Sequence, residues 1–130
     1  QCIALAVYEY NKEITTPENL KRIQSPEKLI ASNDIAAVVI SVPNYLIKTY
    51  VIDSLEAGKH VFCEKPPGRS VEDIVKVIHT EHRHPNLKLM YGFNHRYHES
   101  VQDALKILDS GELGNIINQC NLYRIESPFI

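Results

Sequence analysis

The stretch that decides the fold is His60-Val61-Phe62-Cys63-Glu64-Lys65-Pro66-Pro67. Its first half is mostly apolar and predicts a buried strand, which ends in an acid, a base and two prolines. Open α/β sheets bind their ligands in the crevice outside the carboxyl ends of their strands. We therefore predict that Lys65 belongs to a functional site.

Strand and helix signals alternate on both sides of this stretch. Short apolar runs predict further buried strands over Cys2–Tyr8, Ala37–Ser41 and Leu87–Tyr91. A serine cap followed by proline predicts a short helix from Ser25, and Thr16-Pro17-Glu18 repeats that signal upstream. Apolar residues at helical spacing predict a helix over 46–57 that Gly58 ends, and Ser70 begins another helix.

This alternation predicts βαβ units, and hence an α/β fold with a parallel sheet, over residues 1–96. The pattern changes from residue 97 onward. Val101, Leu105 and Leu108 share a helical stripe, Gly111 and Gly114 bracket a turn, and a long strand is predicted over 116–125. We expect residues 97–130 to be a linking helix and the first strand of a second, α+β domain.

The composition argues against several classes of protein. The 130 residues are 44% hydrophobic and carry a net charge of -2 without a basic run, which favours neither nucleic acid nor an anionic membrane as a partner. No apolar run reaches the roughly 18 residues of a membrane span, and no signal-peptide pattern is present. Cys2, Cys63 and Cys120 lack disulfide or zinc spacing, so we expect buried, reduced thiols in the cytoplasm.

Five short motifs occur in a fixed order. They are Val42-Pro43-Asn44, Leu55-Glu56-Ala57-Gly58-Lys59-His60-Val61, Glu64-Lys65-Pro66, Gly92-Phe93-Asn94-His95-Arg96 and Ser110-Gly111-Glu112-Leu113-Gly114. Together they resemble the Gfo/Idh/MocA oxidoreductases, the glucose-fructose oxidoreductase and inositol dehydrogenase family. The resemblance implies a Rossmann domain, then an antiparallel-sheet substrate domain through which a homo-oligomer forms. It also implies NAD(P)-dependent hydride transfer at a carbinol carbon of a sugar, polyol or nucleotide-sugar.

The resemblance assigns roles to individual residues. Lys65 matches the lysine that hydrogen-bonds the reacting hydroxyl and assists proton transfer, and Glu64 is expected to line the nicotinamide pocket. We also expect a cis Lys65-Pro66 bond. Glu9 matches the acid that binds the adenosine ribose hydroxyls, which favours NAD over NADP, although Lys12 nearby weakens this preference. The other cofactor-binding residues that the resemblance implies are Ser41, Val42, Pro43, Asn44, Asn94 and Arg96.

Two features depart from the family pattern. Ile47 stands where the family commonly has histidine, so a polar contact near the cofactor loop is expected to be absent. No glycine precedes Gly58, so the Gly-rich phosphate loop does not lie in this chain. We therefore expect a fragment of a doubly wound sheet that lacks its first strand, between the strands at 3–7 and 38–41, and is poorly stable alone. The family's catalytic Asp and His are expected beyond Ile130.

Two alternative hypotheses come from other classes of protein. A non-catalytic Rossmann-type binding or oligomerisation module is the first, because Ile47 and the absent phosphate loop leave the site incomplete. A metal site is the second, with the candidate ligands His79, His82 and His84, or His95 and His98. The first three lie where a helix ends before Pro85, which favours solvated or helix-capping imidazoles, and we expect no metal.

Overall fold

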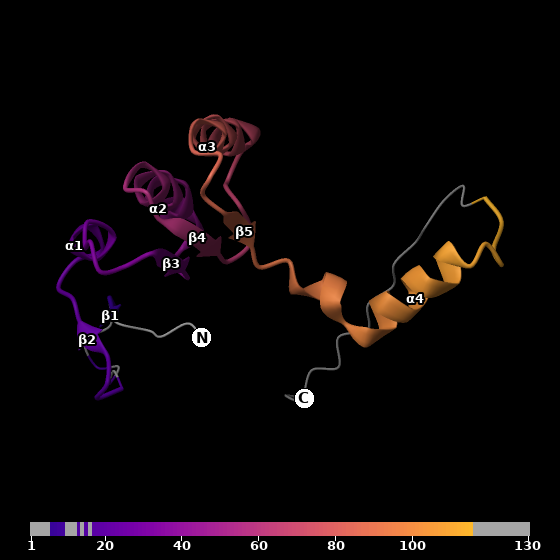
Figure 1. Ribbon diagram of the computed structural model, residues 1–130, viewed down its shortest axis with the longest axis horizontal. Coiled ribbons are helices and arrows are strands. Elements are labelled where there is room, and N and C mark those ends of the chain that lie inside the picture. Colours follow the sequence, from indigo (N-terminus) through magenta and orange to yellow (C-terminus); the bar gives the residue numbers. More distant parts are fainter. Residues whose placement is uncertain (1–5, 10–12, 14, 16, 116–130) are drawn as a thin grey trace. The chain divides into compact units, whose positions relative to one another are not determined.

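The computed structural model describes residues 6–9, 13, 15 and 17–115. The chain divides into two units, residues 1–93 and 94–130. In the first unit, helices lie along one face of a parallel sheet (Figure 1).

The sheet at the centre of the first unit has three strands. They are β3 (Ala37–Ile40), β4 (His60–Cys63) and β5 (Leu89–Tyr91), in the order β3-β4-β5. Both pairs are parallel, and the register aligns Val39 with Phe62 and Phe62 with Met90. The predicted parallel α/β arrangement is therefore confirmed, and the strand over 60–63 lies where the sequence placed it.

A second, two-stranded parallel sheet pairs β1 (Ala6–Val7) with β2 (Lys21–Arg22). The helix that Thr16-Pro17-Glu18 predicted is absent from the described residues between 17 and 24, where a turn precedes β2. Pairing with β1 overrides the local signal, because the Ile23 amide donates to the Val7 carbonyl at 2.9 Å. Among the described residues, β1 and β3 belong to different sheets, and the strand expected to be missing between them stays a prediction.

The described residues of the first unit form the helices α1 (Pro26–Ile30), α2 (Asn44–Glu56) and α3 (Val71–Arg83). The predicted serine caps are confirmed, since Ser25 Oγ accepts from the Lys28 amide at 3.3 Å and Ser70 Oγ accepts from the Asp73 amide at 3.2 Å. Gly58 follows α2 with a φ of 74°, the left-handed conformation expected of a helix-ending glycine.

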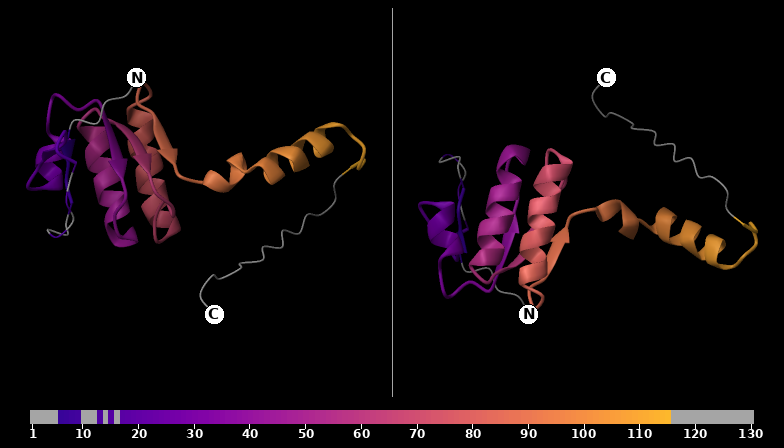
Figure 2. Two further views of the ribbon diagram at one scale, coloured as in Figure 1. Left: turned by 90° about the horizontal axis from the view of Figure 1, so that it is seen from below. Right: turned by 90° about the horizontal axis from the view of Figure 1, so that it is seen from above.

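The core lies between the sheet and α2. Alternate strand residues, among them Val38, Ile40, Val61 and Cys63, are buried, and Ile47, Val51 and Leu55 of α2 pack among them at 1% exposure or less. Each such aliphatic side chain stabilises the fold by about 1.5–3 kcal/mol through removal of apolar surface from water. Helices α2 and α3 run side by side over this layer (Figure 2).

The other alternate residues of the same strands form a row that is open to solvent. Val39, Phe62 and Met90 occupy one register row and are 74%, 38% and 44% exposed. Parallel sheets are ordinarily covered on both faces, so an apolar row of this kind is unusual.

The second unit contains a 3₁₀ helix, η1 (Asn94–Tyr97), and then α4 (Glu99–Asp109). The helix predicted from Val101, Leu105 and Leu108 is therefore confirmed. Gly111 and Gly114 both have positive φ, at 77° and 62°, as their predicted turn requires. The strand predicted over 116–125 lies outside the described residues, and assignment of this unit to a substrate domain stays a prediction.

Candidate functional site

The carboxyl ends of β3, β4 and β5 meet at one edge of the sheet because all three strands are parallel. Hydrogen bonding continues one residue beyond β4 and one residue beyond β5: the Glu64 amide donates to the Ile40 carbonyl at 2.9 Å, and the Gly92 amide donates to the Cys63 carbonyl at 2.8 Å. This pairing fixes the backbone of Glu64 between its two neighbouring strands. The residue after it, Lys65, therefore starts from a well-defined position.

Lys65 and Glu64 are both exposed at this edge. The Lys65 amide donates to Glu64 Oε2 at 3.3 Å, which turns the carboxylate back toward its own chain. The Lys65-Pro66 bond is cis, as expected from the motif.

The segment 66–70 that follows is tied to the helices by Asp73, which is largely buried. Its carboxylate accepts from Lys48 Nζ at 2.8 Å and from the Arg69 amide at 3.3 Å. The Lys48 hydrogen bond, more than the Arg69 amide, lowers the pKa of Asp73 below its ordinary value, against an opposing effect of desolvation. This connection between α2 and α3 supports the loop that carries Lys65.

The loop from Ser41 to Asn44 leaves the end of β3 and enters α2. Pro43 precedes the helix with φ -53°, and Asn44 is its first residue. Asn44 Oδ1 is buried and has no hydrogen-bond partner among the described residues. A buried acceptor in this state costs about 1–3 kcal/mol, so a donor from a bound molecule would fit here.

Glu9 lies two residues after β1, at the carboxyl end of that strand. Arg22 of β2 donates from Nη2 to the Glu9 carbonyl at 3.2 Å. Asn94 and Arg96 belong to η1 of the second unit, so their approach to the cofactor stays a prediction.

Ile47 is 1% exposed and belongs to the apolar core beneath the loop. Its side chain packs against other buried aliphatic residues, so the departure from histidine is accommodated by core packing. Cys63 is likewise fully buried, and desolvation, with a smaller contribution from Glu64, raises its pKa to about 11. This confirms the expectation of a core thiol at Cys63, whereas Cys2 and Cys120 lie outside the described residues.

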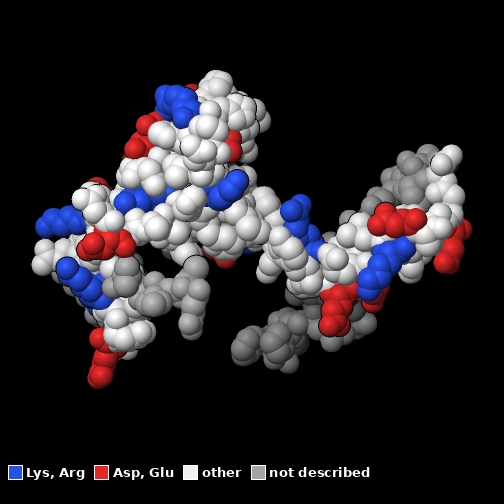
Figure 3. All heavy atoms as spheres, in the orientation of Figure 1, with Lys and Arg blue, Asp and Glu red and all other residues white. Residues whose placement is uncertain are grey.

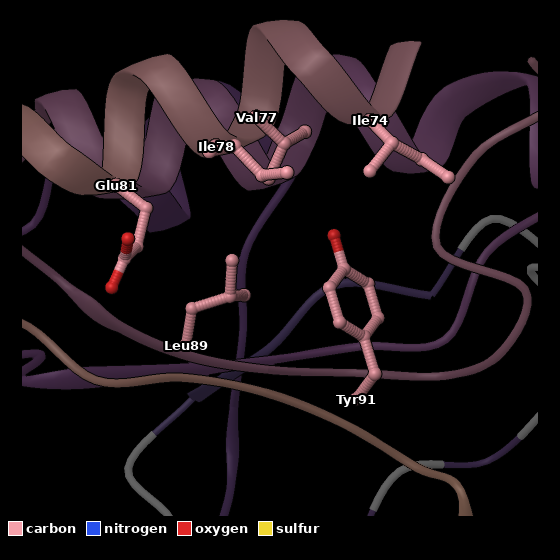
Figure 4. Close-up of a pocket in the computed structure, with 6 residues that line it drawn as sticks. All are labelled: Ile74, Val77, Ile78, Glu81, Leu89 and Tyr91. Atoms are coloured by element: carbon pink, nitrogen blue, oxygen red, sulfur yellow. The ribbon is translucent and has the colours of Figure 1, made fainter. Parts of the chain in front are cut away.

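A hollow of about 210 Å³ lies between α3 and β5 and not among the predicted site residues. Figure 4 shows the Tyr91 hydroxyl pointing toward α3 between apolar side chains. The lining residues are Ile74, Val77, Ile78, Glu81, Leu89 and Tyr91.

The alternative of a metal centre named His79, His82 and His84, or His95 and His98, as its candidate ligands. Within the described ranges, no group of three or more His, Cys, Asp or Glu side chains is arranged to hold a metal ion. The rings of His95 and His98 stack in the second unit, with centroids 5.1 Å apart.

Two further observations concern the surface. No helix among the described residues is long and apolar enough to cross a membrane. Acidic and basic side chains are interspersed on the face of the molecule that Figure 3 shows.

A parallel α/β sheet whose carboxyl edge carries exposed polar residues is typical of a dinucleotide-binding domain. The family model described as "Oxidoreductase family, NAD-binding Rossmann fold" (GFO_IDH_MocA) matches residues 7–93. The chain therefore belongs to the Gfo/Idh/MocA oxidoreductase family, as its motifs indicated.

Curated relatives support the same assignment. Inositol 2-dehydrogenase of Gluconacetobacter diazotrophicus is 34% identical over 89 residues, which is 68% of this chain and 26% of that protein. Levoglucosan dehydrogenase of Pseudarthrobacter phenanthrenivorans is 36% identical over 69% of this chain and 23% of that protein. The 2,7-anhydro-N-acetylneuraminate hydratase of Escherichia coli (strain K12) is 33% identical over 74% of this chain and 26% of that protein. The chain thus spans about a quarter of the length of these relatives.

A solved structure gives the same result at the level of the fold. The scyllo-inositol dehydrogenase from Lactobacillus casei, crystallised with NAD(H) and scyllo-inositol, is 28% identical with a TM-score of 0.76. The match covers 85% of this chain and 34% of that one.

Proposed function

We propose that this chain is the cofactor-binding part of an NAD(P)-dependent dehydrogenase that oxidises a carbinol carbon of a polyol or sugar. The observation that carries the proposal is the position of Lys65, exposed one residue beyond the hydrogen-bonded end of β4 and between the ends of β3 and β5. The relatives named as inositol and levoglucosan dehydrogenases support this substrate class.

The residues at the strand ends fit a nicotinamide dinucleotide. Asn44 Oδ1 is a buried acceptor without a hydrogen-bond partner in the described part of the chain, and the exposed Glu64 carboxylate is a second acceptor. Ribose hydroxyls require acceptors of this kind. Glu9 would accept from the adenosine ribose hydroxyls, which favours NAD. Ser41, Val42 and Pro43 would line the cofactor along the loop after β3.

The bound cofactor supplies a hydride acceptor. The Lys65 ammonium would donate a hydrogen bond to the reacting hydroxyl oxygen and so hold the alcohol in place. The hydroxyl proton would pass to the Asp or His that the family resemblance implies as the principal acid/base partner. The Lys65 ammonium would assist this transfer by stabilising the negative charge that develops on the oxygen, a role that is worth about 10²–10⁴ in rate for a well-placed side chain.

The test uses the intact protein that contains this chain. Cofactor binding is titrated with NADH and NADPH, and turnover is followed by the absorbance of reduced nicotinamide with a panel of inositols, levoglucosan and other sugars. Lys65→Ala is expected to lower kcat by about 10²–10⁴ while cofactor Kd changes little. Lys76→Ala is the matched control, because Lys76 is an exposed lysine of α3 that pairs with Glu72 of the same helix.

Unchanged turnover in Lys65→Ala would remove Lys65 from the mechanism. Failure of the unmutated protein to bind either cofactor would favour the non-catalytic alternative. Consumption of an anhydro-sugar without accumulation of reduced cofactor would instead point to a hydratase, the activity named for the Escherichia coli relative.

A cytoplasmic homo-oligomer is part of the same proposal. It is supported by the resemblance to the family and by cysteine spacing that suits a reducing compartment. Light scattering of the intact protein would measure its oligomeric state.

A further inference from the structure

Gly92 directly follows β5 at the candidate site. Its amide completes the pairing with β4 through the Cys63 carbonyl, at 2.8 Å, and the Phe93 amide donates to the Tyr91 carbonyl, also at 2.8 Å. The second bond closes a three-residue turn with Gly92 at its centre. Gly92 is not among the glycines with positive φ, so its backbone conformation is open to other residues.

The reason for glycine lies in a side chain from the neighbouring strand end. A Cβ at position 92 would lie 3.4 Å from both carboxylate oxygens of Glu64 and 3.5 Å from its Cδ. Such a methyl group would be in van der Waals contact with the whole carboxylate. It would take the place of water or of a ligand group that donates hydrogen bonds to the carboxylate. The loss of such partners from a charged carboxylate costs considerable free energy.

The Glu64 carboxylate is thus held from one side only. The Lys65 amide donates to Oε2 at 3.3 Å, whereas no described residue donates to Oε1. With no side chain on Gly92, both oxygens stay accessible at the edge of the sheet. This is the arrangement that an acceptor of ligand hydroxyl groups needs.

Resting on the proposed function, we propose that Gly92 is a positioning residue for the cofactor site, and that the open space above it keeps the Glu64 carboxylate free to accept hydrogen bonds from the nicotinamide ribose. Gly92 acts through Glu64 and does not touch the cofactor itself. A methyl group at this position therefore weakens cofactor binding only when Glu64 is present.

The experiment is a double-mutant cycle in the intact protein, with NADH Kd and melting temperature measured for the unmutated protein, Gly92→Ala, Glu64→Ala and the double variant. We expect Gly92→Ala and Glu64→Ala each to raise the NADH Kd about tenfold, the loss of one hydrogen bond to a charged group. The double variant is expected to bind within about twofold of Glu64→Ala. A purely structural role for Gly92 would lower the melting temperature in both backgrounds and would not produce this coupling.

Additive losses of binding free energy, which would raise the NADH Kd of the double variant about a hundredfold, would overturn the proposal. Normal NADH binding by Gly92→Ala would also overturn it. If Gly92→Ala does not fold, restoration of folding by Glu64→Ala supports the contact, and failure to restore it overturns the contact. A protein that binds no NADH before any substitution refutes the proposed function itself, a result distinct from additivity in a protein that does bind.

Discussion

Lys65 and Glu64 gain their significance from the strand that precedes them. Val61 and Cys63 are buried, and the chain leaves the core at Glu64. The local pattern alone therefore predicts charged side chains at the carboxyl edge of the sheet. Gly92 begins one of the motifs that carry the family resemblance, but its local pattern indicates only an ordinary turn and does not predict a link to Glu64. Its contact with Glu64 depends on the register between β4 and β5.

Tyr91 is a residue whose hydroxyl is buried without a partner in the part of the chain that the structure describes. Burial, with a smaller contribution from Cys63, raises its pKa from 10.0 to about 12. The folded state thus retains the proton at pH values where the unfolded chain loses it. The contribution of Tyr91 to the free energy of unfolding is fully present below about pH 10 and is lost as the pH rises through about 12.

Tyr91→Phe is expected to leave the unfolding free energy at neutral pH unchanged or raised by about 1 kcal/mol, because it removes an unpaired buried hydroxyl. It should also reduce the alkaline loss of stability. Denaturant unfolding of the intact protein between pH 7 and pH 11 measures both effects. Cys63→Ala is the comparison, since the Cys63 thiol, with a pKa of about 11, adds a separate alkaline loss. Clear destabilisation of Tyr91→Phe at neutral pH would show that the hydroxyl is hydrogen-bonded in solution.

Among the elements, α2 and α3 are joined at their N-terminal halves by the Lys48–Asp73 ion pair. The folded-state pKa of Asp73 is lowered, chiefly by Lys48, so the stability that it contributes is present above the ordinary carboxyl value of 3.8. That stability is lost as the pH falls through the lower folded value.

Lys48→Met is expected to lower the melting temperature of the intact protein by a few degrees at neutral pH. The loss should shrink in acid, where the Asp73 carboxyl becomes protonated in both proteins. Lys76→Met, in the exposed pair with Glu72 on α3, serves as the control and should have a smaller effect. Equal changes in melting temperature for the two substitutions would mean that the Lys48–Asp73 ion pair stabilises the protein no more than an exposed surface pair does.

At the level of the whole chain, the open sheet face is the main feature. Val39, Phe62 and Met90 form an exposed row, and among the described residues β3 is an edge strand of its sheet. Both features favour association with other chains and weaken cooperative folding.

The 130-residue chain by itself is therefore expected to melt over a broad range and to bind hydrophobic dyes. Calorimetry and dye fluorescence would measure this, and Phe62→Ser should lower the dye signal. A sharp two-state transition without dye binding would contradict the expectation of poor stability.

The sequence alone determined the alternation of strands and helices from α1 to β5, the serine caps of α1 and α3, the role of Gly58 and the strand-end position of Lys65. These follow from spacing and from residues that act on their immediate neighbours. The short β2 was missed because its pairing with β1, and not its own composition, makes it a strand. Helix α2 begins at Asn44, two residues before the helix predicted from its apolar residues. The sequence did not show this start, because no side chain caps the helix at Pro43.

Only the tertiary structure decided which distant groups meet. Three arrangements depend on strand register and on how α2 and α3 pack against the sheet. They are the closeness of the Glu64 carboxylate to the space beside Gly92, the burial of Asn44 Oδ1 without a partner among the described residues, and the Lys48–Asp73 bridge. Local sequence patterns specify whether each segment forms a strand, a helix or a turn. The alignment of segments is set by the burial of their apolar faces together, and that alignment places the polar groups of the site.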